Sequence, residues 1–179
     1  MRETEDEASK VLKETEGEKS FRVSFESPQS GWMSVGLKAG GRRLVFGASH
    51  APYDSLRELI EALSALLVEG PPRAVARWNC EPEEYDFEFS SEGERAGLNV
   101  RHYPTRARRA GAARQVFSHR DERLRLVLPF WRELRELRRR TDEDDFERNW
   151  RRTFPASELS ELTKLIRRRR REQRKGNGG

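Results

Sequence analysis

The sequence predicts one α+β domain: an antiparallel sheet of six to seven strands with one inserted helix and with C-terminal helices packed on it. Short segments that alternate apolar and polar side chains recur between residues 21 and 119 and indicate the strands. A leucine-rich segment at 55–67, and further segments after residue 129, have apolar residues at helical spacing. With 179 residues the chain is long enough to bury one core without disulfides or a metal ion.

The first three strands are predicted to form a meander. Residues 21–26 alternate apolar and polar side chains, which is typical of a half-buried strand. The turn-forming residues at 27–31 allow 32–37 to pair back on that strand. Gly40 and Gly41 then provide a second tight turn before a strand at 43–48.

A helix is predicted to follow this meander. Leucines and Ile60 recur at helical spacing over 55–67 and form one wide apolar face, which we expect to lie across one side of the sheet. Ser55 and Glu58 have the spacing of a capping box, and the sequence Gly-Pro-Pro at 70–72 is expected to end the helix.

A second meander is predicted from strands at 75–79, 84–89 and 98–102. The residues from 104 to 114 include four arginines, Gly111 and no acidic side chain, so they predict a mobile basic loop. A last strand is expected at 115–119.

The C-terminal part predicts three helices. Leucines alternate at 124–128 as in a strand, but Pro129 is tolerated in a first helical turn, so a helix is predicted at 129–141 and the structure of 121–128 stays open between strand and helix. Asp142 is expected to cap a short helix. The last helix follows Pro155 and should extend through the arginine run off the body of the protein.

Charge divides the chain into three parts. The residues from 167 to 179 have seven basic side chains and one acidic side chain, a net charge of +6, whereas the whole chain has only +5. The high isoelectric point therefore describes this basic, Gly-ending tail and not the domain. The first nineteen residues are rich in acidic side chains and predict a flexible arm. The predicted parts are thus an arm at 1–19, a domain at 20–166 and a tail at 167–179.

Motifs of known enzyme classes are not found, so we expect a non-catalytic protein without a cofactor. Cys80 is the single cysteine, which excludes an internal disulfide and a cysteine-based zinc site within one chain. The three histidines lack the spacing of a helical metal site. No stretch is apolar enough for a signal peptide or a membrane span, so a reducing cytoplasm is the expected location.

An acidic strand is the predicted binding surface for a basic protein partner. Alternation places Glu84, Asp86 and Glu88 on one face of their strand, while the aromatic residues between them face the core. We expect the three carboxylates to face solvent. The alternative interpretation is a solvated face that arginines of neighbouring strands partly neutralise.

A second functional interpretation is an accessory nucleic-acid-binding protein. Guanidinium groups bind phosphates in bidentate pairs, and each neutralised phosphate releases counterions. The tail has no aromatic residue for base stacking, and it could also be only a solubilising helix end. The candidate residues are Arg106, Arg108 and Arg109 of the loop and Arg167, Arg168, Arg169, Arg170 and Arg171 of the tail.

Several short segments resemble a family of uncharacterised bacterial proteins over about residues 20 to 166. They are Ser27-Pro28-Gln29-Ser30-Gly31-Trp32-Met33, Tyr53-Asp54-Ser55-Leu56, Trp78, Glu81-Pro82-Glu83-Glu84-Tyr85, Phe130-Trp131 and residues 150–155. Some proteins of that kind are similar to immunity proteins encoded beside toxins, which act by binding. The resemblance therefore implies an interaction protein, and it implies no catalytic residue.

Overall fold

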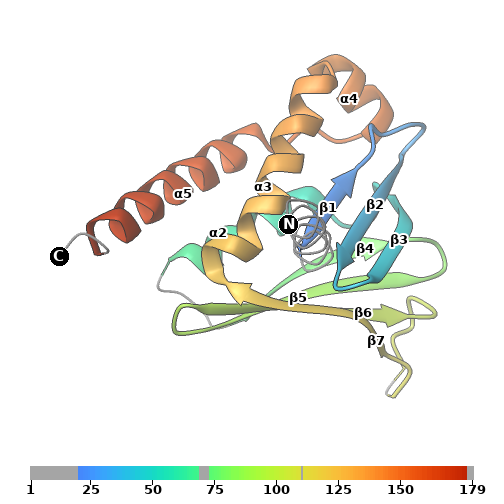
Figure 1. Ribbon diagram of the computed structural model, residues 1–179. Helices are drawn as coiled ribbons and strands as arrows, with labels where there is room; N and C mark the ends of the chain where they lie inside the picture. The colour runs from blue at the N-terminus through green and yellow to red at the C-terminus, as the bar shows by residue number, and fades with distance from the viewer. Residues whose placement is uncertain (1–19, 69–72, 110, 177–179) are drawn as a thin grey trace, which may run out of the picture.

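The computed structural model describes residues 20–68, 73–109 and 111–176, and it confirms the α+β class. One seven-stranded antiparallel sheet holds the strands in chain order, so that each strand pairs with the next one along the chain (Figure 1). The strands are β1 Arg22–Phe25, β2 Trp32–Ala39, β3 Arg42–Ser49, β4 Arg73–Asn79, β5 Glu84–Glu92, β6 Arg95–Tyr103 and β7 Arg114–Glu122.

The sheet has two halves that are joined at one end. β2 pairs with β3 along its full length, and β5 pairs in the same way with β6, whereas β3 and β4 pair only through Ser49 and Asn79. The two halves therefore diverge from this contact. In Figure 1 the strands β1–β3 are drawn at a steep angle to the strands β4–β7. Aromatic rings fill the space between the two halves. The ring centre of Phe21, next to β1, lies 6.3 Å from that of Phe117 on β7 and 5.4 Å from that of Phe130.

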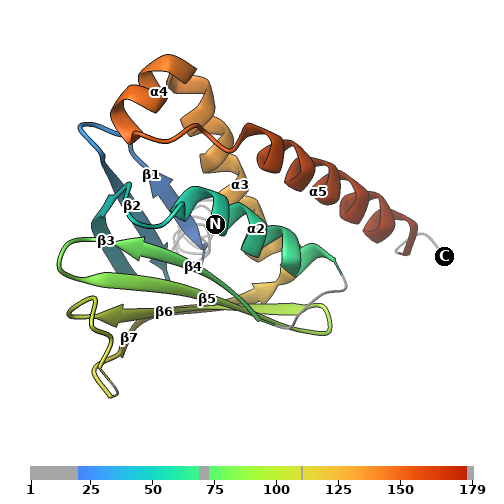
Figure 2. The same cartoon turned by 180° about the vertical axis from the view of Figure 1, so that it is seen from behind.

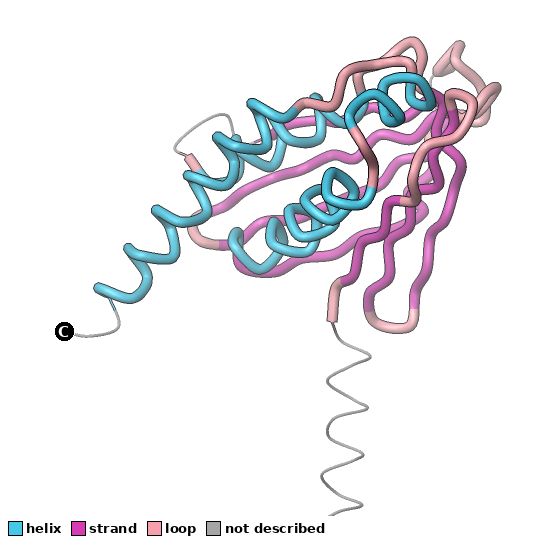
Figure 3. Tube along the Cα trace, turned by 90° about the horizontal axis from the view of Figure 1, so that it is seen from above, coloured by secondary structure: helices cyan, strands magenta, loops and turns pink. Residues whose placement is uncertain are grey.

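The helices lie on the core side of the sheet (Figures 2 and 3). α2 packs on β4, and α3 packs on β1 and on the end of β7. α5 packs on α2 and α3 and so forms an outer layer, and its C-terminal half projects beyond the sheet. The helices are α2 Ser55–Leu67, α3 Arg123–Arg140, α4 Glu143–Trp150 and α5 Ala156–Gly176.

The structure settles the open segment at 121–128. β7 ends at Glu122 and α3 begins at Arg123, so the helix starts six residues before the predicted position and Pro129 lies inside it. The alternation of leucines misled the prediction because Leu124 and Val127 also share a helical face, and both are buried in α3.

The predicted capping box of α2 does not form. Asp54 is the N-cap residue, and Ser55 lies inside the helix with its side chain buried. Glu58 turns instead to β4, where it accepts hydrogen bonds from the backbone N–H of Arg77 at 2.9 Å and from its guanidinium at 2.6 Å. The predicted stop at 70–72 and the predicted arm at 1–19 lie outside the described residues.

Two predictions for the C-terminal helices are confirmed. Asp142 caps α4, since its side chain accepts a hydrogen bond from the backbone N–H of Asp144 at 3.0 Å. α5 continues through the arginine run to Gly176 without a break, so the boundary predicted at residue 167 falls inside a helix. Among the helices of the described residues, none has both the length and the apolar composition that a bilayer crossing requires.

Candidate functional site

Two of the three predicted acidic side chains are buried. The side chain of Glu84 is only 1% exposed and that of Asp86 only 8%, whereas that of Glu88 is 35% exposed. They do lie on the face of β5 that points away from the aromatic core, as the alternation predicts. The expectation that all three face solvent is wrong, because a loop covers this end of the sheet.

The covering group is Arg108, from the loop between β6 and β7. Its Nε donates to Glu84 at 2.7 Å, and its two terminal nitrogens donate to the two oxygens of Asp86 at 2.7 and 2.8 Å. The hydroxyl of Tyr53 donates to the other oxygen of Glu84 at 3.0 Å. The guanidinium carbon also lies 4.4 Å from the ring centre of Tyr103. Every oxygen of the two carboxylates therefore has a partner within the protein.

The electrostatics of this cluster favour its present charge state. The hydrogen bonds to Asp86 raise the pKa of Arg108 most, and those to Glu84 raise it further, so the guanidinium stays protonated. Burial raises the pKa of Tyr53, and its bond to Glu84 adds to that effect, so the hydroxyl stays a donor. We refer to Tyr53, Glu84, Asp86 and Arg108 as the buried ion cluster.

The remaining arginines of the loop are only loosely held. Arg106 approaches Glu84 at 3.7 Å, but its side chain is 59% exposed. Arg109 is exposed, and no acidic side chain of the described residues pairs with it. Glu88 accepts a hydrogen bond from Asn99 at 3.0 Å and lies 3.5 Å from Arg101, so β6 neutralises it in the way the alternative interpretation expects. The predicted basic loop thus has its central arginine anchored.

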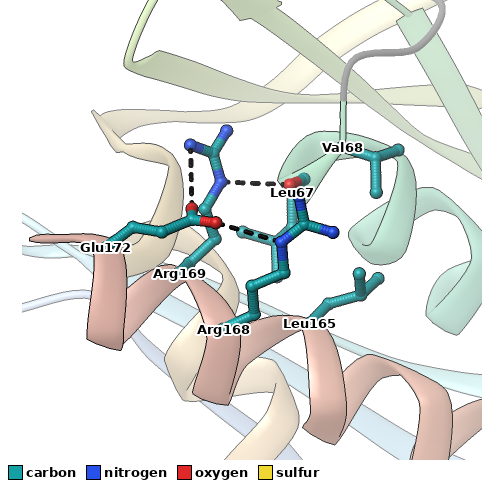
Figure 4. A pocket seen from close by; sticks show the side chains of 6 residues that line it. All are labelled: Leu67, Val68, Leu165, Arg168, Arg169 and Glu172. Atoms are coloured by element: carbon teal, nitrogen blue, oxygen red, sulfur yellow. Dashed lines mark hydrogen bonds and ion pairs between the residues drawn. The ribbon is translucent and has the colours of Figure 1, made fainter.

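The arginine run of α5 is divided between two roles. Arg169 points to the body, where its Nε donates to the backbone carbonyl of Leu67 at 3.0 Å (Figure 4). Arg123 donates to the neighbouring carbonyl of Leu66 at 3.1 Å. α2 has no basic residue in its own last turn, so these two arginines satisfy and neutralise its C-terminal end. Arg168 is paired with Glu172 at 3.0 Å.

The other arginines of α5 face solvent on one side of the helix. From one helical turn to the next they are spaced three or four residues apart, and they line a shallow hollow of about 450 Å³ together with Lys164. Lys164 is paired with Glu161, but no acidic side chain of the described residues pairs with the arginines. These arginines are Arg167, Arg170, Arg171 and Arg174.

Helix α3 extends the same basic surface. A second hollow of about 450 Å³ lies between α3 and α5, and Lys164 and Arg167 line both hollows. We call the combined area the α3–α5 basic surface. Its basic residues are Arg135, Arg138, Arg139, Lys164, Arg167, Arg170, Arg171 and Arg174. Sequence reasoning missed the three arginines of α3, although they recur three or four residues apart on one helix.

Trp131 holds the two helices together beneath this surface. Its indole N–H donates to the hydroxyl of Thr163 on α5 at 2.9 Å. The guanidinium of Arg135 lies 4.7 Å from its ring centre, and that of Arg170 lies 5.8 Å away. The ring is only 9% exposed, so it positions arginines and offers no open face for stacking a base.

Cys80 does not provide a nucleophile. Burial, with smaller contributions from Glu83 and Glu84, raises the pKa of its thiol to about 12. The thiol is therefore protonated at neutral pH, and a reactive cysteine needs the thiolate. Within the described residues there is also no group of three histidine, cysteine, aspartate or glutamate side chains that could hold a metal ion.

Comparison of this chain with protein-family models, with curated proteins and with solved structures found no match. The resemblance to immunity-type proteins therefore stays a prediction.

Proposed function

We propose that this protein binds nucleic acid through the α3–α5 basic surface, by contacts between its arginines and backbone phosphates. The observation that carries the proposal is that five guanidinium groups on two packed helices have no acidic partner among the described residues: that of Arg135 on α3 and those of Arg167, Arg170, Arg171 and Arg174 on α5. Arg138 and Arg139 of α3 are paired with Glu143 and Glu136. An arginine without a partner keeps its donors free, and arginine donors match the geometry of phosphate oxygens.

The shape of the surface favours recognition of the backbone. From Lys164 to Arg174 the helix presents its cations over about 15 Å, at 1.5 Å of rise per residue. A double helix has one phosphate charge per about 1.7 Å of its axis, so several phosphates lie within reach of this stretch. Since Trp131 is covered, base stacking adds nothing. The proposed binding is therefore independent of base sequence. We propose it as a non-catalytic role in a bacterial cytoplasm.

A protein partner at the acidic strand is the weaker proposal. A basic partner would have to displace Arg108 from three hydrogen bonds in order to reach Glu84 and Asp86. Only Glu88 remains partly exposed, and one carboxylate is a small target for long-range attraction. The proposed function therefore keeps the tail arginines that the sequence suggested for nucleic-acid binding. It replaces the loop arginines of that interpretation by the arginines of α3.

The test is a triple variant, Arg167→Gln, Arg170→Gln and Arg171→Gln, which keeps good helix formers in α5. We expect weaker binding to duplex DNA. The slope of log Kobs against log salt concentration should become less steep by up to about 2.7, or about 0.9 for each lost phosphate contact. Fluorescence anisotropy over a salt series measures both quantities.

The matched control removes the same charge from another surface. Arg22, Lys38 and Arg43 lie side by side across β1, β2 and β3. Their replacement by Gln should leave the affinity within about twofold, since they lie on a different face. If this control reduced the salt slope and the α5 variant did not, the nucleic-acid site would be on the sheet and the proposal would be wrong.

A further inference from the structure

The open face of the second half-sheet carries a row of four residues that points to a ligand. β4 to β7 place Arg73, Ser90, Gly97 and Arg120 side by side in register, one on each strand. The helices lie on the opposite face of the sheet (Figure 3). A hollow of about 450 Å³ lies over this row, and we call it the sheet hollow. Two small residues thus lie between two arginines.

Gly97 makes room for this hollow. Its backbone is not among the positive-φ glycines, so the sheet does not need glycine here for its conformation. A Cβ atom at this position would lie 3.2 Å from Ser90 Oγ and 3.5 Å from Arg120 Cγ. The side chain of Arg120 therefore lies across the glycine, and the absence of a side chain lets the guanidinium approach the floor of the hollow.

The charges around the hollow are unbalanced. Arg73, Arg95 and Arg120 line it, and among the described residues none of them has an ion pair. The one acidic side chain that lines it is Glu92. At the other end of the same face Arg108 is bonded to Asp86, so the protein neutralises one end of the face and leaves the other end positive. Three guanidinium groups against one carboxylate favour an anion.

We propose that the sheet hollow binds a phosphate group, with Arg73 and Arg120 contacting it from opposite sides and the Ser90 hydroxyl donating from the floor. Arginine pairs and a hydroxyl supply the donors that phosphate oxygens accept. A volume of about 450 Å³ is within the usual range for small-ligand sites, so a mononucleotide fits. The phosphate belongs to a free nucleotide or to a nucleic-acid backbone. The site is separate from the α3–α5 basic surface.

The test compares adenosine monophosphate with adenosine by isothermal titration calorimetry. The wild-type protein should bind the nucleotide and not the nucleoside. The double variant Arg73→Gln, Arg120→Gln should bind the nucleotide at least about tenfold more weakly, because charge-assisted hydrogen bonds are lost. Arg22→Gln with Arg43→Gln, which removes two charges from the other half-sheet, should bind as the wild type does. Equal binding of nucleotide and nucleoside, or equal loss in both double variants, would overturn the proposal.

Glu92→Gln gives a test of opposite sign. Removing the one carboxylate of the hollow should strengthen nucleotide binding about two- to fivefold, whereas a purely structural change would weaken it or leave it unchanged. An unchanged or weaker affinity would contradict a phosphate at this position.

Adding substitutions in the sheet hollow to the α5 triple variant shows whether the phosphate belongs to a free nucleotide or to nucleic acid. If Arg73→Gln with Arg120→Gln further weakens duplex DNA binding in that background, the hollow holds a backbone phosphate. If DNA binding is unaffected while nucleotide binding falls, the ligand is a free nucleotide. Binding of neither by the wild-type protein at millimolar concentration would overturn the inference without bearing on the α3–α5 basic surface.

Discussion

The loop between β6 and β7 and the C-terminal half of α5 are both rich in arginine, but they use it differently. Arg108 of the loop is held by two buried carboxylates and by the ring of Tyr103. Arg171 of α5 lies in the open, and no described acidic side chain pairs with it. One region is an internal ion cluster, and the other is a surface that can bind an anion.

The difference shows that the acidic partners around an arginine decide whether it can bind a ligand. The number of arginines in the same segment does not decide it. The loop follows β6, whose Tyr103 lies opposite Glu84, so the chain leaves the sheet next to the acidic strand. α5 ends beyond the sheet (Figure 1), where Glu172 is paired with Arg168. Arginine can therefore stabilise a fold at one place and remain available for a ligand at another.

The largest expected effect is on the buried ion cluster. Arg108→Ala leaves Glu84 and Asp86 buried without their cation, and we expect the free energy of unfolding to fall by about 3 kcal/mol. Urea denaturation at neutral pH measures it. Arg109→Ala, in the same loop, should change the value by less than about 0.5 kcal/mol. Equal small effects of both variants would show that the loop does not neutralise the acidic strand.

The second prediction concerns the hydroxyl that completes the cluster. Tyr53→Phe removes the hydrogen bond to Glu84 and should cost about 1 to 2 kcal/mol. Burial and Glu84 raise the pKa of Tyr53 in the native state. Its contribution is therefore complete below the unfolded pKa of about 10 and is lost as pH rises through the higher native value.

The difference in unfolding free energy between wild type and Tyr53→Phe should accordingly shrink above pH 10. Tyr85→Phe serves as the control at neutral pH, because no hydrogen bond joins the Tyr85 hydroxyl to Glu84, so its removal should cost less than that of the Tyr53 hydroxyl. A Tyr53→Phe difference that stayed constant to high pH, or that was no larger than the Tyr85→Phe difference at neutral pH, would separate Tyr53 from the cluster.

Much of the fold could be predicted from periodicity. Period-2 alternation indicated the strands, and the leucines of 55–67 indicated α2, because burial on one face imposes these patterns. The start of α3 could not be predicted this way, since Leu124, Leu126 and Leu128 alternate as in a strand while Leu124 and Val127 share a helical face. Cap chemistry also failed at α2, where Glu58 bonds Arg77 of a strand that no local pattern connects to it.

The candidate site was harder to predict, because alternation tells which face a side chain is on and not what covers that face. Glu84 and Asp86 are covered by Arg108, which lies 24 and 22 residues further along the chain in a segment without periodicity. A signal was present: the antiparallel pairing of 84–89 with 98–102 brings an acidic strand beside an arginine-rich loop. In the tail, helical spacing applied to the arginines would have separated Arg169 from its neighbours.

The smallest expected effects on stability come from two residues of the same run of five consecutive arginines. They give the sharpest comparison, because the two residues lie so close in the sequence. Arg169 donates to the carbonyl of Leu67 at the end of α2 and is 26% exposed. Arg169→Ala should cost about 1 kcal/mol of unfolding free energy, from the lost hydrogen bond and the lost cation at a helix C-terminus. Arg171→Ala should cost less than about 0.5 kcal/mol, since nothing in the described structure bonds it.

DNA binding should show the opposite order. Arg171→Ala should reduce the salt slope by about 0.9, as expected for one phosphate contact. Arg169→Ala should leave the slope nearly unchanged, because Nε of Arg169 is bonded to Leu67 and its Nη1 lies 3.8 Å from Glu94. Chemical denaturation and a salt series on the same two proteins measure both properties. If the two variants behaved alike in both measurements, the run would act as an undivided tail, and the division between structural and ligand-binding arginines would be wrong.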